Sequence, residues 1–145
     1  MTPGITAPAP STATRWASRT QFFCSGFIFA TWGVHIPTVK AHYGIDEAQL
    51  GFAMLAAGCG ALLGLTRAGG WIGHRGAPRE GGRGGVVFAV FLSGVIAMPG
   101  FSALLVLLAL FGVVTSVFDV AINTEAGQLE LQGGRALMSG MHGMF

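Results

Sequence analysis

Long uncharged stretches dominate the chain and predict membrane-spanning helices. Three stretches contain no charged side chain: Thr20–Val39, Ala48–Thr66 and Gly84–Phe118. A spanning helix needs about 20 predominantly apolar residues to cross about 30 Å of hydrocarbon. The third stretch is long enough for two crossings. Met98-Pro99-Gly100 lies where a turn between them is needed, because proline ends a helix and glycine permits a tight turn.

This pattern predicts an all-α membrane protein with four transmembrane helices plus the start of a fifth. We expect the four spans at about residues 20–39, 47–68, 84–98 and 101–125. Asp46 is well placed as the N-cap of the second span, because a carboxylate there can accept hydrogen bonds from the free amides of the first turn.

The segments between and beyond the spans carry most of the polar residues. We expect a disordered cytoplasmic tail at residues 1–19, a flexible glycine-rich inner loop at 69–85 and a polar inner loop at 126–134. Residues 136–145 resemble the start of a fifth helix, but ten residues rise only about 15 Å. A terminus inside hydrocarbon would leave carbonyls without partners, so we expect a truncated piece of a longer protein.

Composition supports the bilayer as the main partner. Hydrophobic residues make up 52% of the chain and charged residues 10%, whereas soluble domains carry about 25% charged residues. The net charge of +2 is too small to suggest nucleic acid. The sequence has no CxxC, HExxH or phosphate-loop motif, so we expect no metal, no cofactor and no enzymatic activity.

The placement of the basic residues predicts the orientation. Lys40 is the single basic residue expected on one side of the bilayer. The other side holds seven, namely Arg15, Arg19, Arg67, Arg75, Arg79, Arg83 and Arg135. Basic residues in short loops favour the cytoplasm, which predicts a multi-pass protein of the inner (plasma) membrane with a cytoplasmic N-terminus.

Asp119 and Asn123 are the main candidates for chemistry inside the membrane. Asp119 is the only carboxylate deep in an expected span, where a charge costs at least a few kcal/mol. Asn123 lies one helical turn further on and so shares its face. The pair could bind a polar substrate or carry a proton, or it could form a structural hydrogen bond between helices. Glu125 and Glu130 are expected to be ordinary charges near the inner surface.

Two further features of the spans have competing interpretations. Trp32 and His35 lie at the end of the first span. They could anchor the helix at the membrane interface or line an outer cavity. The second span contains Gly60-x-x-x-Gly64, within the small-residue stretch Gly58–Gly64. Small residues let helices approach closely, so this stretch predicts helix packing.

Four stretches together resemble the major facilitator superfamily of transporters, and more narrowly its fucose-permease-like branch. They are Phe22-Phe23-x-x-Gly26-Phe27 through Trp32-Gly33-x-x-Ile36-Pro37, Gly69–Gly76, Asp119-x-x-x-Asn123, and Gly134-Arg135 through Met138-Ser139-x-x-His142-Gly143-x-Phe145. The resemblance covers about residues 20–145. It implies part of an N-terminal six-helix transporter half, whose substrate site lies between two halves near the midplane.

The resemblance also implies roles for particular residues. It places the substrate or proton-coupling function on Asp119 and Asn123, and it adds His142 to Trp32 and His35 as a possible cavity-lining residue. It implies an inner-loop gating motif at Gly69, Arg75, Gly76 and Arg79. The sequence departs from the pattern at Gly33, where fucose permeases carry a second essential carboxylate, and at the acidic position of the inner loop, which is His74 or Gly73.

The leading hypothesis is therefore a truncated, proton-coupled secondary transporter that moves a small solute by alternating access. Its partners would be the bilayer, the solute, a proton and the missing C-terminal part of the transporter. The alternative is a self-contained four-helix membrane protein that forms homo-oligomers through Gly58–Gly64. Substrate identity and the choice between symport and antiport lie beyond this sequence.

Overall fold

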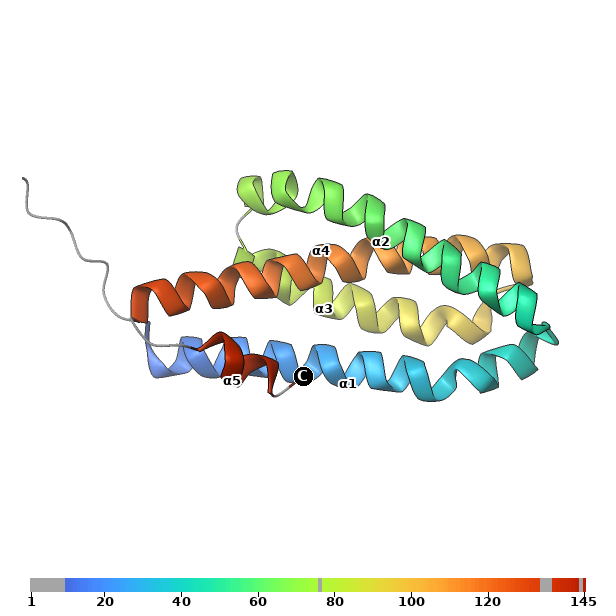
Figure 1. Ribbon diagram of the computed structural model, residues 1–145, viewed down its shortest axis with the longest axis horizontal. Coiled ribbons are helices and arrows are strands. Elements are labelled where there is room, and N and C mark those ends of the chain that lie inside the picture. The colour runs from blue at the N-terminus through green and yellow to red at the C-terminus, as the bar shows by residue number, and fades with distance from the viewer. Residues whose placement is uncertain (1–9, 76, 134–136, 144) are drawn as a thin grey trace, which may run out of the picture.

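The computed structural model is a bundle of long helices (Figure 1). It describes residues 10–75, 77–133, 137–143 and 145. In chain order the elements are α1 (Thr12–Tyr43), α2 (Glu47–Arg75), α3 (Ala77–Gly94), the 3₁₀ turn η1 (Val95–Ala97), α4 (Phe101–Gly133) and the short α5 (Met138–His142). Successive long helices run in opposite directions, and α5 lies beside α1 (Figure 1).

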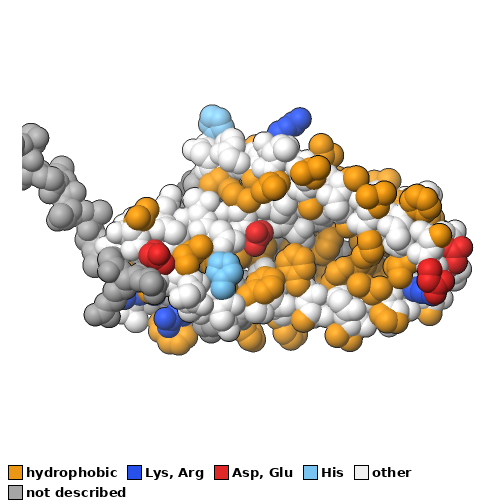
Figure 2. Space-filling model, viewed as in Figure 1, with side chains coloured by type: hydrophobic (Ala, Val, Ile, Leu, Met, Phe, Trp, Pro, Cys, Tyr) orange, Lys and Arg blue, Asp and Glu red, His pale blue; other side chains and the backbone are white. Residues whose placement is uncertain are grey.

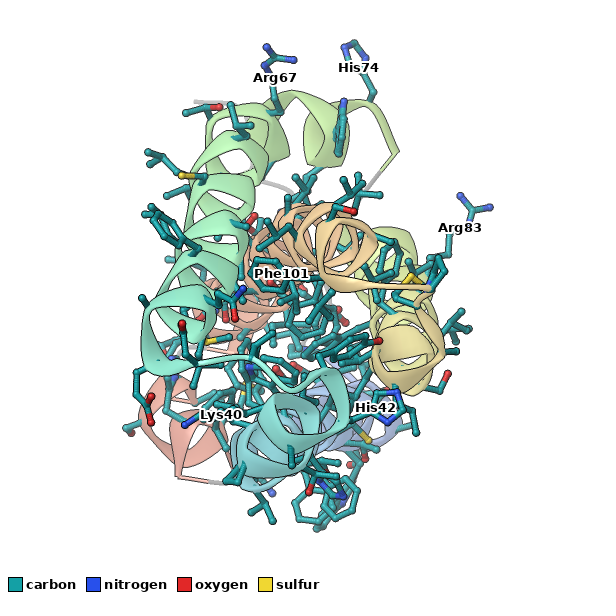
Figure 3. The ribbon with its side chains drawn as sticks, turned by 90° about the vertical axis from the view of Figure 1, so that its right-hand side faces the viewer. Lys40, His42, Arg67, His74, Arg83 and Phe101 are labelled. Atoms are coloured by element: carbon teal, nitrogen blue, oxygen red, sulfur yellow. The ribbon has the colours of Figure 1, made fainter. Side chains whose placement is uncertain are left out.

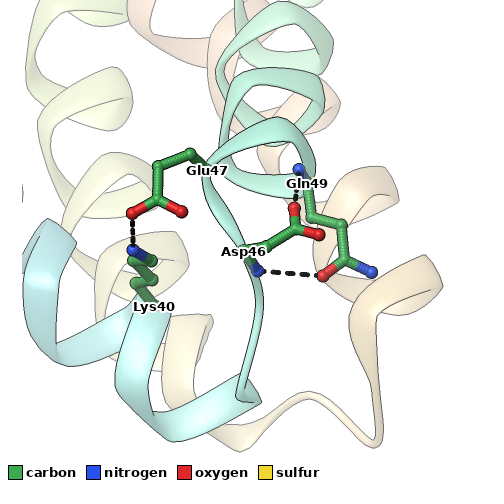
Figure 4. A network of polar contacts seen from close by, with 4 residues as sticks. All are labelled: Lys40, Asp46, Glu47 and Gln49. Carbon is green, nitrogen blue, oxygen red and sulfur yellow. Dashed lines mark hydrogen bonds and ion pairs between the residues drawn. The ribbon is translucent and has the colours of Figure 1, made fainter.

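The turn between α1 and α2 is specified by two capping motifs. Gly44 ends α1 with φ +59°, a left-handed conformation that glycine adopts without strain, and its N–H donates to the carbonyl of Ala41. Asp46 then starts α2, because its Oδ1 accepts from the Gln49 amide at 2.8 Å. The Gln49 side chain accepts in return from the Asp46 amide at 3.0 Å (Figure 4). The predicted N-cap is confirmed as a reciprocal capping box.

The two turns at this end of the bundle are joined to each other. The Tyr43 hydroxyl donates to the carbonyl of Val95 at 2.6 Å and accepts from the Met98 amide at 3.2 Å. Across the first turn, Lys40 pairs with Glu47 (Figure 4). The predicted turn at Met98–Gly100 is confirmed, since η1 ends at Ala97 and α4 begins at Phe101.

Among the described residues, three helices are long and apolar enough to cross a membrane. They are Thr12–Tyr43, Glu47–His74 and Phe101–Gly133. The expected third span is a shorter apolar helix, Gly82–Ala97, which includes η1. Hydrophobic side chains extend along the visible face of the molecule and few charged ones interrupt them (Figure 2). The chain is thus an all-α membrane protein.

The helices extend well beyond the expected spans, which corrects three boundaries. Thr12–Arg19 are helical rather than disordered, because Ser11 caps α1 by accepting from the Thr14 amide. The expected loop at 69–85 is helical up to Arg75 and again from Ala77, and the expected loop at 126–134 is helical up to Gly133. Residues 1–9 and 134–136 lie outside the described residues. The apolar stretch marks the hydrocarbon, whereas good helix formers such as Gln128 and Glu130 continue the helix into water.

α2 and α4 pack through glycine, as the small-residue stretch predicts. A Cβ on Gly60 would lie 1.8 Å from the carbonyl oxygen of Ala109, and one on Gly112 would lie 2.0 Å from that of Ala57. A Cβ on Gly64 would lie 2.2 Å from the Ser116 hydroxyl and 2.6 Å from the carbonyl oxygen of Val113. The two backbones therefore approach directly, and the packing role of Gly60-x-x-x-Gly64 is confirmed.

The other side of α4 packs through large side chains. Phe88 of α3 is fully buried, with ring centroids 4.9 Å from Phe111, 6.2 Å from Phe118 and 5.2 Å from Phe29 of α1. The buried residues that extend this aromatic cluster are Phe22, Ile122, Ala126, Leu129 and Met141. Aromatic side chains thus fill the space between α1, α3, α4 and α5.

Candidate solute and proton site on α4

Asp119 and Asn123 form a hydrogen-bonded pair on α4. The Asn123 side-chain amide donates to Asp119 Oδ1 at 3.2 Å and to the Asp119 carbonyl at 2.9 Å. Asp119 is exposed and Asn123 is half-buried among the described residues. The carboxylate therefore has free acceptor sites, and the Asn123 Oδ1 remains available to a donor.

The position of the pair along α4 sets its depth. The helix has 33 residues, which is about 50 Å at 1.5 Å per residue, about 20 Å more than the hydrocarbon. Asp119 is 18 residues beyond Phe101, or about 27 Å from the turn that α4 shares with η1. The pair therefore lies toward the opposite side of the hydrocarbon, where a carboxylate is easier to hydrate than at the midplane.

α5 brings His142 to this part of α4. His142 lies near the Asp119 carboxyl. The imidazole is exposed, lies against Phe22 with centroids 5.1 Å apart, and has its Nδ1 3.0 Å from the carbonyl of Met138. Glu130 holds the start of α5, because its Oε2 accepts from the amides of Leu137 and Met138 at 2.8 and 2.9 Å.

Trp32 and His35 lie elsewhere, in a cavity of about 400 Å³ between α1, α3 and η1. The cavity is mostly apolar, with Thr31 and Ser93 as its other polar side chains. His35 Nδ1 is 2.8 Å from the carbonyl of Thr31. Asp119 and Asn123 are not among its lining residues, so the described structure does not join the two groups of candidates.

The expected gating motif straddles the junction of α2 and α3. Gly69 lies within α2, Arg75 ends that helix and Arg79 lies within α3. Gly76 and the side chains of Arg75 and Arg79 lie outside the described residues. The neighbouring basic side chains Arg67, His74 and Arg83 point away from the bundle (Figure 3). The gating role stays a prediction.

One residue that sequence reasoning passed over is Glu125. It was expected to be an ordinary surface charge, but only 6% of it is exposed. It lies within α4, and the Gln21 side chain of α1 is within hydrogen-bonding reach of its carboxyl. A signal was present in the first span, where Gln21 and Ser25 lie four residues apart on either side of Phe22 and Phe23.

Comparison with known proteins shows what the chain is similar to. It is 31% identical over 139 residues, 96% of its length, to an uncharacterised MFS-type transporter of Yersinia pestis. It is 33% identical over 123 residues to the membrane protein MosC of Rhizobium meliloti, and 31% identical over 124 residues to the uncharacterised transporter y4wD of Sinorhizobium fredii. No protein-family model and no solved structure matches.

The chain spans about a third of the length of these relatives: 36%, 30% and 33% respectively. Two of the three are named as transporters and the third as a membrane protein, and no name refers to an enzyme or to the fucose-permease-like branch. The chain is therefore a membrane protein that is similar over most of its length to part of an MFS-type transporter.

Proposed function

We propose that the chain is part of a proton-coupled secondary transporter that moves a small polar solute by alternating access. The supporting observation is the Asp119–Asn123 pair, which is hydrogen-bonded and yet exposed on an apolar helix. An ionisable group there is stable where it faces water or a polar partner. The relatives, about three times as long as this chain, are transporters by name.

In this proposal Asp119 carries the proton and Asn123 contacts the solute. The exposed face of the pair looks into the central cavity, which is completed by the missing C-terminal part of the transporter. The homo-oligomer is less favoured, because Gly60 and Gly64 already pack against α4 and are not free for a second copy.

The decisive experiment is Asp119→Asn in the transporter that continues this reading frame. The change keeps the size and hydrogen bonding of the side chain but removes its charge. We expect it to abolish pH-gradient-driven accumulation in proteoliposomes while solute exchange persists, and Asn123→Ala to weaken solute binding instead. Uphill transport at the parental rate in Asp119→Asn would show that the pair is structural.

The proposed orientation has the N-terminus and the α2–α3 junction in the cytoplasm of an inner-membrane protein. It rests on the excess of arginine at that side. Cys24 and Cys59 are first replaced by Ala. A cysteine at Ala41 should then react with an impermeant thiol reagent added to intact cells, and one at Ala77 should not. The reverse labelling pattern would overturn the orientation.

A further inference from the structure

Three buried side-chain oxygen atoms of α1 and α4 have no hydrogen-bond partner among the described residues. They are Glu125 Oε2, Gln21 Oε1 and Ser25 Oγ. Glu125 is 6% exposed and Ser25 is fully buried. Buried polar atoms without partners are rare in folded proteins because each costs about 1–3 kcal/mol. Because Gln21 and Glu125 lie beside each other, one bound proton could give both of their oxygens a partner.

Gln21 lies next to Glu125, and Ser25 lies on the same face of α1 as Gln21. Gln21 and Ser25 are four residues apart on α1 and so share a face. Gln21 reaches the carboxyl of Glu125 from across the interface. The surroundings are apolar, with Phe22, Ile122 and Ala126 all buried in the aromatic cluster.

No described cation compensates the Glu125 carboxylate. On the elements that pack against α4, the described basic side chains include Arg15 and Arg19 of α1, Arg67 and His74 of α2, Arg83 of α3, and His142 of α5. None of these forms a salt bridge with Glu125, since the ion pair among the described residues is Lys40–Glu47. A buried carboxylate without a cation is costly, and binding a proton removes that cost.

We propose that Glu125, together with Gln21 and Ser25, forms a second proton-binding site, separate from Asp119. A proton on Oε2 turns that atom into a donor, and the unpartnered Gln21 Oε1 is its acceptor. When the proton leaves, a flip of the Gln21 amide presents N–H to the carboxylate instead. One glutamine thus accommodates both protonation states of Glu125.

The location gives this site a use that rests on the proposed transport function. Glu125 is six residues beyond Asp119 on the same helix, about 9 Å along its axis. It lies between Asp119 and the proposed cytoplasmic end of α4. Glu125 is therefore a second proton acceptor on α4, placed between Asp119 and that end of the helix.

The site can be tested without any transport assay. The 145-residue chain, carrying Asp119→Asn to silence the other carboxyl, is placed in lipid nanodiscs and titrated with acid under infrared spectroscopy. We expect the carbonyl band of a buried protonated carboxyl. Glu125→Gln should remove this band, whereas Glu47→Gln, the same change at an exposed glutamate, should leave it unchanged. Circular dichroism verifies that the helices remain folded.

A second variant keeps the carboxyl and removes its partner. Gln21→Met preserves the length of the side chain but cannot hydrogen-bond, so the carbonyl band should persist at a shifted frequency. The inference is overturned by an unchanged band in Glu125→Gln, by an unshifted band in Gln21→Met, or by sodium displacing the proton at fixed pH. These outcomes are independent of whether Asp119→Asn blocks uphill transport.

Discussion

The two sides of α4 are packed in opposite ways. Toward α2, the contact is backbone against backbone, with Gly60, Gly64 and Gly112 leaving no room for a side chain. Toward α1 and α3, the contact runs through large aromatic rings and includes buried oxygens without partners. The glycine contact holds α2 and α4 together as a unit. The side of α4 toward α1 and α3 leaves buried polar groups, which a bound proton or a helix movement can satisfy.

The first prediction, and the largest effect, concerns the glycine contact between α2 and α4. In Gly112→Leu, the new Cβ would lie 2.0 Å from the Ala57 carbonyl oxygen, so α2 and α4 must separate. We expect a loss of more than about 3 kcal/mol, the upper end of overpacking costs. Unfolding in mixed detergent micelles measures it. Gly127→Leu is the control, because a Cβ there meets nothing within 4 Å, and equal losses in the two would refute the tight contact.

The second prediction loosens the aromatic side. Phe88 is fully buried among three other rings, and Phe88→Ala leaves a cavity that neighbouring rings fill only partly. The expected cost is about 3 kcal/mol. The same unfolding measurement should show little change for Phe52→Ala, since Phe52 is 61% exposed on the surface of α2. A small loss for Phe88→Ala would mean that this side is not tightly packed.

Features that depend on residues close together in the sequence could be predicted, whereas features that depend on contacts between distant helices could not. The turn at Asp46 and the glycine contact depend on local motifs, and both are confirmed. The shared face of Asp119 and Asn123 follows from helical spacing and is confirmed by their hydrogen bond, while their role stays a prediction. Each of these features could be predicted from the sequence of a single helix or turn.

Glu125 shows where such reasoning stops. Its burial depends on how α1 and α4 align, with Arg15 near Gly133 at one end and Trp32 near Phe111 further along. Hydrophobic patterning cannot supply that alignment between distant segments. Helix ends were missed for a different reason, because hydropathy follows the thickness of the bilayer, whereas α4 continues about 20 Å beyond it.

The third prediction tests the join between the two turns. Tyr43→Phe keeps the ring but removes the hydroxyl that bonds to Val95 and Met98. The expected loss in unfolding free energy is about 1 kcal/mol, typical of one buried hydrogen-bonding group. Hydrogen exchange at the Met98 amide should accelerate in parallel. Unchanged exchange there would show that the hydroxyl does not hold η1 to α1.

The smallest effect is expected at α5, the element that completes the α1 side. The Glu130 carboxylate accepts from the amides of Leu137 and Met138, and a charged acceptor makes the stronger bond. Glu130→Gln retains a neutral acceptor, so α5 should stay in place while these two amides exchange a few times faster. Glu47→Gln serves as the control, since it makes the same change beside the α1–α2 turn. α5 also brings His142 near Asp119. If the amides exchange faster but the titration of the Asp119 carboxyl is unchanged, His142 reaches the carboxylate without this anchor. Unchanged exchange would remove Glu130 from the account of how α5 is held.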